Sequence, residues 1–373
     1  MGKDNTMNLE DLGWDVFFSG EYETVKAPDT VPARVVTIEK DLCHVLTASG
    51  ELAAQMSGRM RYLAGSVEQY PAIGDWLVVR PLPGEPKATI QAILPRKTKF
   101  SRQVSGGRQR IAGGKTEEEV VAANVDTVFL VSGLDGGRNM NLRRIERYLA
   151  IARASGAEPV IVLNKVDVCP DIEVHIKEAA TIASGVPIHA ISATARIGMD
   201  VFKQYLGKGC TAALLGSSGV GKSAIINALL GEERLATGAV RQSDLEGRHT
   251  TTRRELILLP GGGAVIDTPG MREIQVWGDE QSLDSAFIDI SELAKGCRFT
   301  DCRHDKEPGC AVREALRRGE LDMSHFKSYL KIQRELQHLA TRQEGNAAIA
   351  EKTRWKQISK IQKRIKKNSE GDW

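Results

Sequence analysis

The sequence predicts a multidomain chain: an N-terminal β-barrel, a central α/β domain with a parallel sheet, and a mainly helical C-terminal domain. Short β-rich runs separated by glycine and proline fill residues 31–95. Strands alternate with helices over residues 116–280, and helical spacing dominates residues 281–345. A length of 373 residues with 41% hydrophobic residues is sufficient for several domains.

The charge of the chain is unevenly distributed. Lys and Arg total 51 and Asp and Glu total 48, which gives a net charge of +3. Residues 351–373 carry +5 and residues 96–115 carry +7, which leaves −9 on the rest. Two basic blocks on an acidic body indicate contacts with a polyanion such as a nucleic acid.

The sequence shows neither a membrane span nor a secretion signal. Its apolar runs are shorter than the roughly 18 residues that a membrane-spanning helix needs, and Asp4, Glu10 and Asp11 interrupt the region where a signal peptide is apolar. We expect a cytoplasmic monomer that does not bind membranes. Cytoplasmic cysteines normally stay reduced, so clustered cysteines indicate a metal site or catalysis.

Five short β-rich runs define the predicted barrel, with residues 1–30 before it as an extension that has no readable pattern. The runs occupy residues 34–38, 42–46, 52–56, 76–79 and 89–93. Five short strands with turn residues between them predict an oligonucleotide-binding (OB) fold, and an SH3-like barrel fits the pattern nearly as well.

Residues 96–115 are predicted to form a flexible basic linker, because they contain two Gly-Gly pairs and lack hydrophobic periodicity. The α/β domain follows over residues 116–280. Its apolar runs are at residues 125–131, 159–163, 211–215 and 263–266.

A phosphate-binding loop precedes a predicted helix. The pattern G-x-x-x-x-G-K-[ST] follows the apolar run 211–215, which gives the strand–loop–helix context that the motif requires. Backbone N–H groups would surround phosphate oxygens, Lys222 would reach the β- and γ-phosphates, and the Ser223 hydroxyl would bind Mg²⁺. The loop consists of Gly216, Ser217, Ser218, Gly219, Val220, Gly221, Lys222 and Ser223.

The sequence Asn-Lys-Val-Asp at residues 164–167 is predicted to recognise guanine. It closes an apolar run, and ligand contacts in doubly wound sheets lie at the carboxyl ends of strands. The Asp167 carboxylate can accept hydrogen bonds from the ring N–H and the exocyclic amine of guanine, whereas adenine would present an acceptor to it. The Lys165 stem would cover the base, and Asn164 would hold the loop.

Asp267 and Gly270 form a D-x-x-G motif after the strand-like run 263–266. Asp267 could hold a Mg²⁺-bound water, and the Gly270 N–H could meet the γ-phosphate. A second match at residues 244–247 follows a polar stretch, so the context favours Asp267. The intervening segment 247–252 has three threonines suited to sensing Mg²⁺ and γ-phosphate, although threonine runs also occur in ordinary strands and turns.

Three cysteines and a histidine cluster in the predicted helical domain. Three thiolates and an imidazole favour one tetrahedral structural Zn²⁺, in which no coordination position stays open for catalysis. Unliganded thiols and redox use are the alternatives. The predicted ligands are Cys297, Cys302, His304 and Cys310.

Residues 346–373 are predicted to form a basic C-terminal helix and tail. Its lysines, like the basic linker, fit contacts with a phosphate backbone. A solvated helix face or a helix on a membrane surface are the alternatives, but four apolar side chains make a thin anchor. Those side chains, spaced three or four apart, are Trp355, Ile358, Ile361 and Ile365.

The order of the nucleotide motifs is permuted. In ordinary small GTPases the phosphate loop comes first, whereas here residues 164–167 precede residues 216–223 and Asp267 follows both. A sheet tolerates this order if its former termini lie close enough to be joined. With these motifs in this order, the cysteine–histidine set and Gly74-Asp75 in the barrel, the sequence closely resembles the RsgA family of circularly permuted ribosome biogenesis GTPases over residues 30–345.

The resemblance implies an OB-fold barrel, a circularly permuted α/β P-loop GTPase domain and a zinc domain, acting on the 30S ribosomal subunit and its 16S rRNA late in maturation. GTP and GDP would be bound with Mg²⁺, which Ser223 and Thr251 would hold. Ser192 and Ala193 would join the GTP-binding residues.

The resemblance also implies a catalytic histidine. Met271 follows Gly270 where Ras-like enzymes carry a glutamine that orients the attacking water, and a thioether cannot orient it. In this family the role falls to the histidine before the threonine run, here His249. A neutral imidazole could accept a hydrogen bond from the water, and contact with phosphate or RNA is the alternative.

These observations predict a GTPase that hydrolyses GTP slowly alone and faster on the 30S subunit, with hydrolysis linked to release. A GTP-gated RNA scaffold, for which hydrolysis is incidental, is a second hypothesis. A P-loop kinase acting on a small molecule would leave the guanine motif and the cysteine cluster unexplained.

Overall fold

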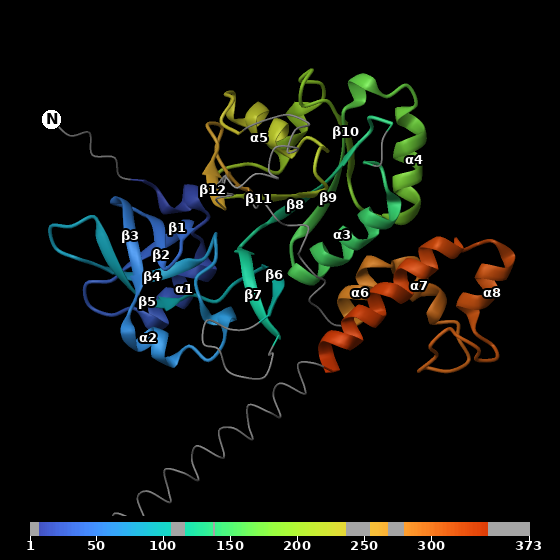
Figure 1. Ribbon diagram of the computed structural model, residues 1–373, viewed down its shortest axis with the longest axis horizontal. Coiled ribbons are helices and arrows are strands. Elements are labelled where there is room, and N and C mark those ends of the chain that lie inside the picture. Colours follow the sequence, from blue (N-terminus) through green and yellow to red (C-terminus); the bar gives the residue numbers. More distant parts are fainter. Residues whose placement is uncertain (1–6, 106–115, 137–138, 236–253, 268–279, 342–373) are drawn as a thin grey trace, which may run out of the picture.

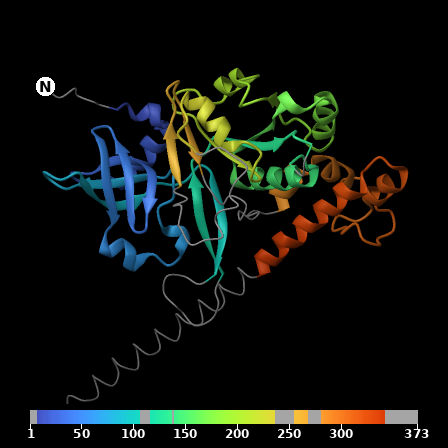
Figure 2. The same ribbon diagram turned by 45° about the horizontal axis from the view of Figure 1, so that its top comes forward.

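The computed structural model describes residues 7–105, 116–136, 139–235, 254–267 and 280–341. The barrel lies at one end of the molecule and the C-terminal helices at the other, with the α/β sheet between them (Figures 1 and 2). Within these ranges, no helix combines the length and apolar character needed to cross a membrane.

The predicted barrel is confirmed, and each predicted run falls in one of its strands. The strands pair in the order β1-β2-β3-β5-β4, and β4 pairs back with β1, which closes the barrel. Only the β3–β5 pairing is parallel, and this order is that of an OB fold. The strands are β1 (Val31–Glu39), β2 (Leu42–Thr47), β3 (Gly50–Met56), β4 (Trp76–Pro81) and β5 (Lys87–Ile93), with α2 (Gly58–Leu63) and the 3₁₀ helix η2 (Val67–Gln69) between β3 and β4.

The N-terminal extension covers one side of the barrel. The 3₁₀ helix η1 (Leu9–Leu12) and helix α1 (Val16–Val25) bury Leu12 and Phe18 against Trp76 of β4. The two helices together bury too few apolar residues to give the regular spacing that marks a helix in a sequence. The sequence therefore does not predict the structure of this extension.

The prediction of a flexible linker is wrong for residues 99–105. They form strand β6 (Lys99–Ser105), which pairs antiparallel with β7 (Thr116–Ala123). The hairpin lacks apolar alternation because charged pairs across the strands stabilise it, among them Arg102 with Glu119 at 2.9 Å. Residues 106–115 of the predicted linker lie outside the described residues.

The central domain is a doubly wound sheet with the order β10-β9-β8-β11-β13-β12. All neighbours pair in parallel except β12, and β12 also joins β1 at Glu255 and Thr37, so the sheet continues into the barrel. Apolar residues pack on both faces of the sheet. The strands are β8 (Thr127–Gly133), β9 (Glu158–Asn164), β10 (Ile188–Ile191), β11 (Thr211–Gly216), β12 (Glu255–Leu258) and β13 (Ala264–Asp267), and the helices are α3 (Leu142–Ser155), η3 (Val166–Val168), α4 (Ile172–Ile182), η4 (Met199–Gln204) and α5 (Lys222–Leu230).

The C-terminal region is helical, as predicted. Residues 323–341 form a long helix, and α6 packs on α3 of the central domain. Leu283, Phe287 and Ile290 are buried in the core that these helices share with the sheet. The shorter helices are α6 (Glu280–Ala286), α7 (Ile288–Ala294) and α8 (Ala311–Arg318).

Candidate nucleotide and metal sites

Those predicted nucleotide residues that lie within the described ranges gather at one edge of the central sheet. Strands β9, β10, β11 and β13 run in the same direction, so the loops that follow them emerge at the same edge. The last residues of these strands are Asn164, Ile191, Gly216 and Asp267.

The phosphate loop joins the end of β11 to the start of α5. Gly219 and Gly221 have positive φ angles of 82° and 99°, and a Cβ on Gly221 would lie 2.2 Å from the Asn164 side chain. Only glycine fits there, and the backbone N–H groups at a helix start such as that of α5 are suited to binding an anion. Lys222 Nζ donates to the carbonyls of Gly216 and Ser217, at 2.8 Å each.

Asn164 joins three of the predicted nucleotide-binding loops. Its side-chain Nδ2 donates to the Val220 carbonyl at 2.9 Å, and its Oδ1 accepts from the Ala193 N–H at 3.0 Å. The residue is only 2% exposed, so these bonds are protected from water. The amide therefore fixes the guanine motif against the phosphate loop and the loop after β10.

Lys165 and Asp167 are accessible beside this junction. Lys165 adopts a φ of 70°, and its Nζ lies 2.5 Å from the Asp135 carboxylate. Asp167 is exposed in η3. Partial burial would raise the pKa of Asp135, but the hydrogen bonds from Lys165 and Asn139 lower it overall, so its carboxylate stays charged.

The remaining predicted residues fall into three groups. Ser192 and Ala193 are buried in the tight turn after β10, where Ser192 Oγ accepts from the Ala195 N–H at 3.0 Å. Ser223 lies in the first turn of α5, and Ser218 and Gly219 are exposed at the tip of the loop. His249, Thr251 and Gly270, like the segment 247–252, lie outside the described residues.

Sequence reasoning missed two residues at this edge, Asp135 and Arg144. Arg144 Nη1, from the first turn of α3, donates to Ser217 Oγ of the phosphate loop. Asp135 could have been suspected because it follows a buried strand at the ligand-binding edge. No motif marks Arg144, whose partner is 73 residues away.

The cysteine–histidine set forms a compact cluster whose four ligand atoms all lie within 4.8 Å of one another. Cys297 Sγ is 3.9 Å from Cys310 Sγ, and His304 Nδ1 is 3.4 Å from Cys310 Sγ. Thiolates bound at about 2.3 Å to a tetrahedral zinc are about 3.8 Å apart, so the cluster fits this metal. Burial raises the pKa of Cys297, but hydrogen bonds from the Val312 and Ala311 backbone at the start of α8 lower it overall.

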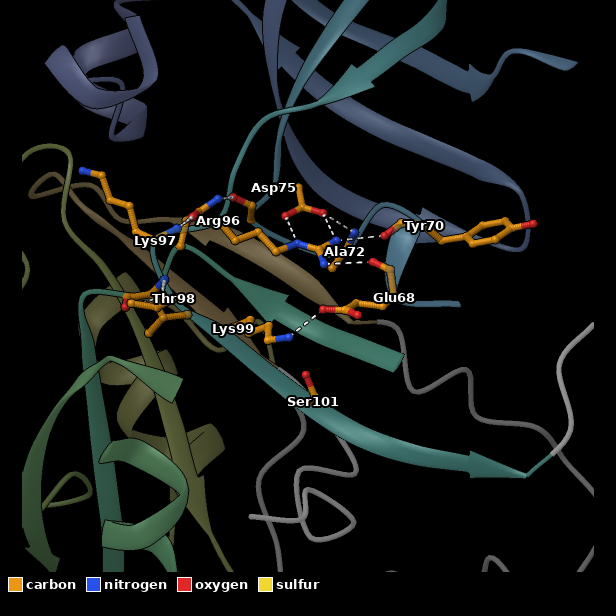
Figure 3. A network of polar contacts seen from close by, with 12 residues as sticks. Glu68, Tyr70, Ala72, Asp75, Arg96, Lys97, Thr98, Lys99 and Ser101 are labelled. Carbon is orange, nitrogen blue, oxygen red and sulfur yellow. Dashed lines mark hydrogen bonds and ion pairs between the residues drawn. The ribbon is translucent and has the colours of Figure 1, made fainter. Parts of the chain in front are cut away.

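The described part of the basic block at residues 96–115 is engaged inside the protein. Arg96 pairs with the fully buried Asp75 at 2.7 Å (Figure 3). Lys99 Nζ lies 2.6 Å from Glu68 Oε1, and Lys97 contacts Asp15. These ion pairs form within the protein, and the Lys97 and Lys99 side chains remain 36% and 40% exposed.

The fold and the edge site define a P-loop GTPase whose motifs occur in circularly permuted order. The chain belongs to the RsgA family of GTPases. A family model described as RsgA GTPase matches residues 93–277. The chain is 46% identical to the small ribosomal subunit biogenesis GTPase RsgA of Opitutus terrae, over 98% of this chain and 100% of that protein. It is 44% identical to RsgA 1 of Oceanobacillus iheyensis, over 89% of this chain and 92% of that protein.

Solved structures agree with this assignment. The crystal structure of YjeQ from Thermotoga maritima is 27% identical, with a TM-score of 0.60 over 82% of this chain and 98% of that one. The structure of YloQ, described as a circularly permuted GTPase, is 21% identical, with a TM-score of 0.57 over 84% of this chain and 98% of that one, which supports the fold. A second family model, described as ABC transporter, matches residues 200–367, a range that includes the phosphate loop common to many nucleotide-binding proteins.

Proposed function

We propose that this GTPase binds the 30S ribosomal subunit through its 16S rRNA and assists late maturation of the subunit. It hydrolyses GTP slowly alone and faster on the subunit, and hydrolysis is linked to release. The names of the relatives support the ribosomal role. We expect the protein to act in the cytoplasm as a monomer, without membrane contact.

The observation that carries the proposal is the junction at Asn164. One buried amide holds the guanine motif, the phosphate loop and the loop after β10 together, so a single nucleotide can contact all three. The chain then leads from Asp267 at the same edge to α6 at residue 280. In the permuted order, the segment expected to sense the γ-phosphate therefore connects directly to the C-terminal helices.

In the proposed reaction a water attacks the γ-phosphorus, the bond to the β-phosphate oxygen breaks, and GDP and phosphate result. Lys222 would leave its loop carbonyls to neutralise the β- and γ-phosphates, and Asp167 would select guanine. Mg²⁺, held by Ser223 and Thr251, would offset the negative charge of the phosphates. His249 would orient the water.

The decisive experiment compares GTP and ATP turnover with and without purified 30S subunits. We expect slow GTP hydrolysis, a clear increase on adding subunits, and little ATP hydrolysis under either condition. Equal turnover of both nucleotides, or no response to subunits, would refute the proposal.

Guanine selectivity tests the placement of the base. Asp167→Asn puts a donor opposite the guanine N–H groups, and we expect GTP affinity to fall by about 100-fold, the range for an unpaired buried polar group. Competition between labelled GTP and ATP measures this. Asp171→Asn, which alters an exposed carboxylate on the same loop, is the matched control. An unchanged GTP preference in Asp167→Asn would contradict the assignment.

The role of His249 is tested through the subunit-stimulated rate. His249→Ala should lower stimulated turnover by about 100-fold, the usual contribution of a group that handles a proton or orients water. The affinity for GTP should stay nearly unchanged. Stimulated turnover at the wild-type rate would remove this histidine from the mechanism.

A further inference from the structure

Helix α3 lies between the phosphate loop and the C-terminal helices. Neighbouring side chains near the start of α3 contact the phosphate loop and the C-terminal helices. Arg144 contacts the phosphate loop, whereas Glu146 and Arg147 contact the helix at residues 323–341. Figure 1 shows α3 beside α6 and the C-terminal helices at this side of the sheet.

The contact with the phosphate loop is close to the phosphate-binding lysine. Arg144 Nη1 donates to Ser217 Oγ, and the Ser217 carbonyl in turn accepts from Lys222 Nζ at 2.8 Å. The start of α3 is fixed, because Asn141 Oδ1 accepts from the Arg144 N–H at 3.1 Å as an N-cap. A shift of α3 would therefore move the Arg144 guanidinium and the loop residue that it holds.

The contact with the C-terminal region is buried and charged. Glu146 is 1% exposed and His325 is 3% exposed, and Glu146 Oε1 lies 2.5 Å from His325 Nδ1. The other ring nitrogen of His325 lies 3.1 Å from Asp289 of α7. Charge-assisted hydrogen bonds of this kind are strong and directional where water is excluded.

Two further pairs extend the contact along α3. Arg147 Nη1 is 2.7 Å from Glu335 Oε2, about three turns further along the C-terminal helix than His325. Arg143 contacts both Glu146 and Asp322, and Asp322 accepts from the His325 N–H at 2.7 Å. The C-terminal helix is thus held to α3 at several points.

We propose that α3 couples the C-terminal domain to the nucleotide: Arg144 is a positioning residue for the phosphate loop, and the contacts of Glu146 and Arg147 with helix 323–341 set the position of α3. A partner that shifts the C-terminal domain would then change nucleotide affinity, and the nucleotide would change affinity for that partner by the same factor. The inference rests on the proposed binding of GTP at the phosphate loop.

The test measures binding and dissociation of fluorescent GTP and GDP by stopped flow, with the full-length protein. Glu335→Gln removes one charge from a pair whose side chains are 31% and 34% exposed, and we expect it to change nucleotide affinity by about fivefold, at the lower end of usual coupling strengths. Arg144→Gln should have at least this effect, and Arg144→Lys, which keeps a charged donor, should restore part of it. Glu320→Gln, an exposed glutamate before the same helix, should leave both nucleotides unaffected.

A double-mutant cycle separates coupling from independent damage. If α3 transmits the effect, Glu335→Gln should change affinity much less in the Arg144→Gln background than alone. His325→Gln should change nucleotide affinity as Glu335→Gln does. If His325→Gln does not fold, the results for Glu335→Gln alone decide whether α3 transmits the effect. Wild-type nucleotide kinetics in Glu335→Gln, or effects that simply multiply in the double variant, would overturn the proposal.

Lys222→Ala distinguishes this failure from failure of the proposed function. If Lys222→Ala binds GTP as tightly as the wild type, the nucleotide does not bind at the phosphate loop, and both proposals fall. If Lys222→Ala binds weakly while Glu335→Gln binds normally, only the coupling through α3 is refuted.

Discussion

At the scale of single residues, a buried ion pair holds the segment that follows β5 to the turn before β4. The Asp75 carboxylate accepts from Arg96 Nε at 2.7 Å and from the Ala72 N–H at 2.7 Å. Arg96 also donates to the carbonyls of Glu68 and Tyr70 (Figure 3). Burial would lower the pKa of Arg96, but the hydrogen bond and charge of Asp75 outweigh this and raise it. Both charges are thus compensated, and removal of either would leave the other unpaired.

We therefore predict that Arg96→Met lowers the free energy of unfolding by about 3 kcal/mol, the usual cost of breaking a buried pair. Lys87→Met is the matched control, because Lys87 pairs with Glu85 on the exposed surface of the barrel, where loss of an ion pair should leave stability nearly unchanged. Urea denaturation of both variants measures the difference. Equal losses of stability would show that the buried pair contributes no more than a surface pair.

Residues that act through local spacing could be predicted from the sequence, and those that act through distant partners could not. The phosphate loop, the guanine motif and the cysteine–histidine set are each contained in a short segment, so their chemistry is readable. Arg144 and His325 have no such pattern, since their partners are 73 and 179 residues away. Asp75 likewise belongs to no local motif whose chemistry is readable, and its role follows from its contact with Arg96.

At the scale of elements, the pattern of apolar residues predicts the strands, except for a strand in which charged residues take the place of apolar ones. The five barrel strands and the buried parallel strands have the apolar residues expected of them. Strand β6 instead carries Lys99 and Arg102, which pair with Glu118 and Glu119 of β7. The basic composition of residues 99–105 therefore predicts a linker, whereas these residues form one strand of a hairpin.

The loop that holds the cysteine–histidine set is expected to depend on a bound metal for its structure. It has little regular structure between α7 and α8, so metal ligation would supply the constraint that a core supplies elsewhere. We predict about one equivalent of zinc in the purified protein by metal analysis. Cys310→Ser should lose the metal and make residues 295–320 sensitive to protease. Cys169→Ser, at a cysteine far from the cluster in sequence, should keep both the bound zinc and the resistance to protease. A wild-type protein that contains no metal and still resists protease would contradict the site.

At the scale of the whole molecule, the three parts are joined by the central domain. Strand β12 pairs with β1 of the barrel through Glu255 and Thr37, and α3 holds the C-terminal helices through Glu146 and His325. The net charge of +3 conceals this organisation, because Arg96 and Lys99 of the basic block form ion pairs with Asp75 and Glu68 within the protein. The sequence could reveal the separate parts, but the contacts between them form only when the chain is folded.

The contact between α3 and the C-terminal helices makes the stability of the whole molecule dependent on pH. Burial would lower the pKa of His325, but Asp289 and Glu146 outweigh it and raise the pKa to about 9. Asp322 and Arg143 are the other charged groups at this contact. Since an unfolded histidine has a pKa of about 6.5, the folded state holds the proton more tightly. The resulting stabilisation is fully present below pH 6.5 and is lost as the pH rises through about 9.

We therefore predict that the wild type loses on the order of 2 kcal/mol of stability between about pH 6.5 and pH 9.5 through this group. His325→Gln carries no proton to lose, so its stability should be lower at neutral pH and should change less over the same range. Thermal unfolding of the two proteins at matched ionic strength measures both effects. Parallel pH profiles for the two proteins would show that His325 does not hold a proton at this contact, and that the C-terminal helices are joined to α3 by packing and the surface pairs alone.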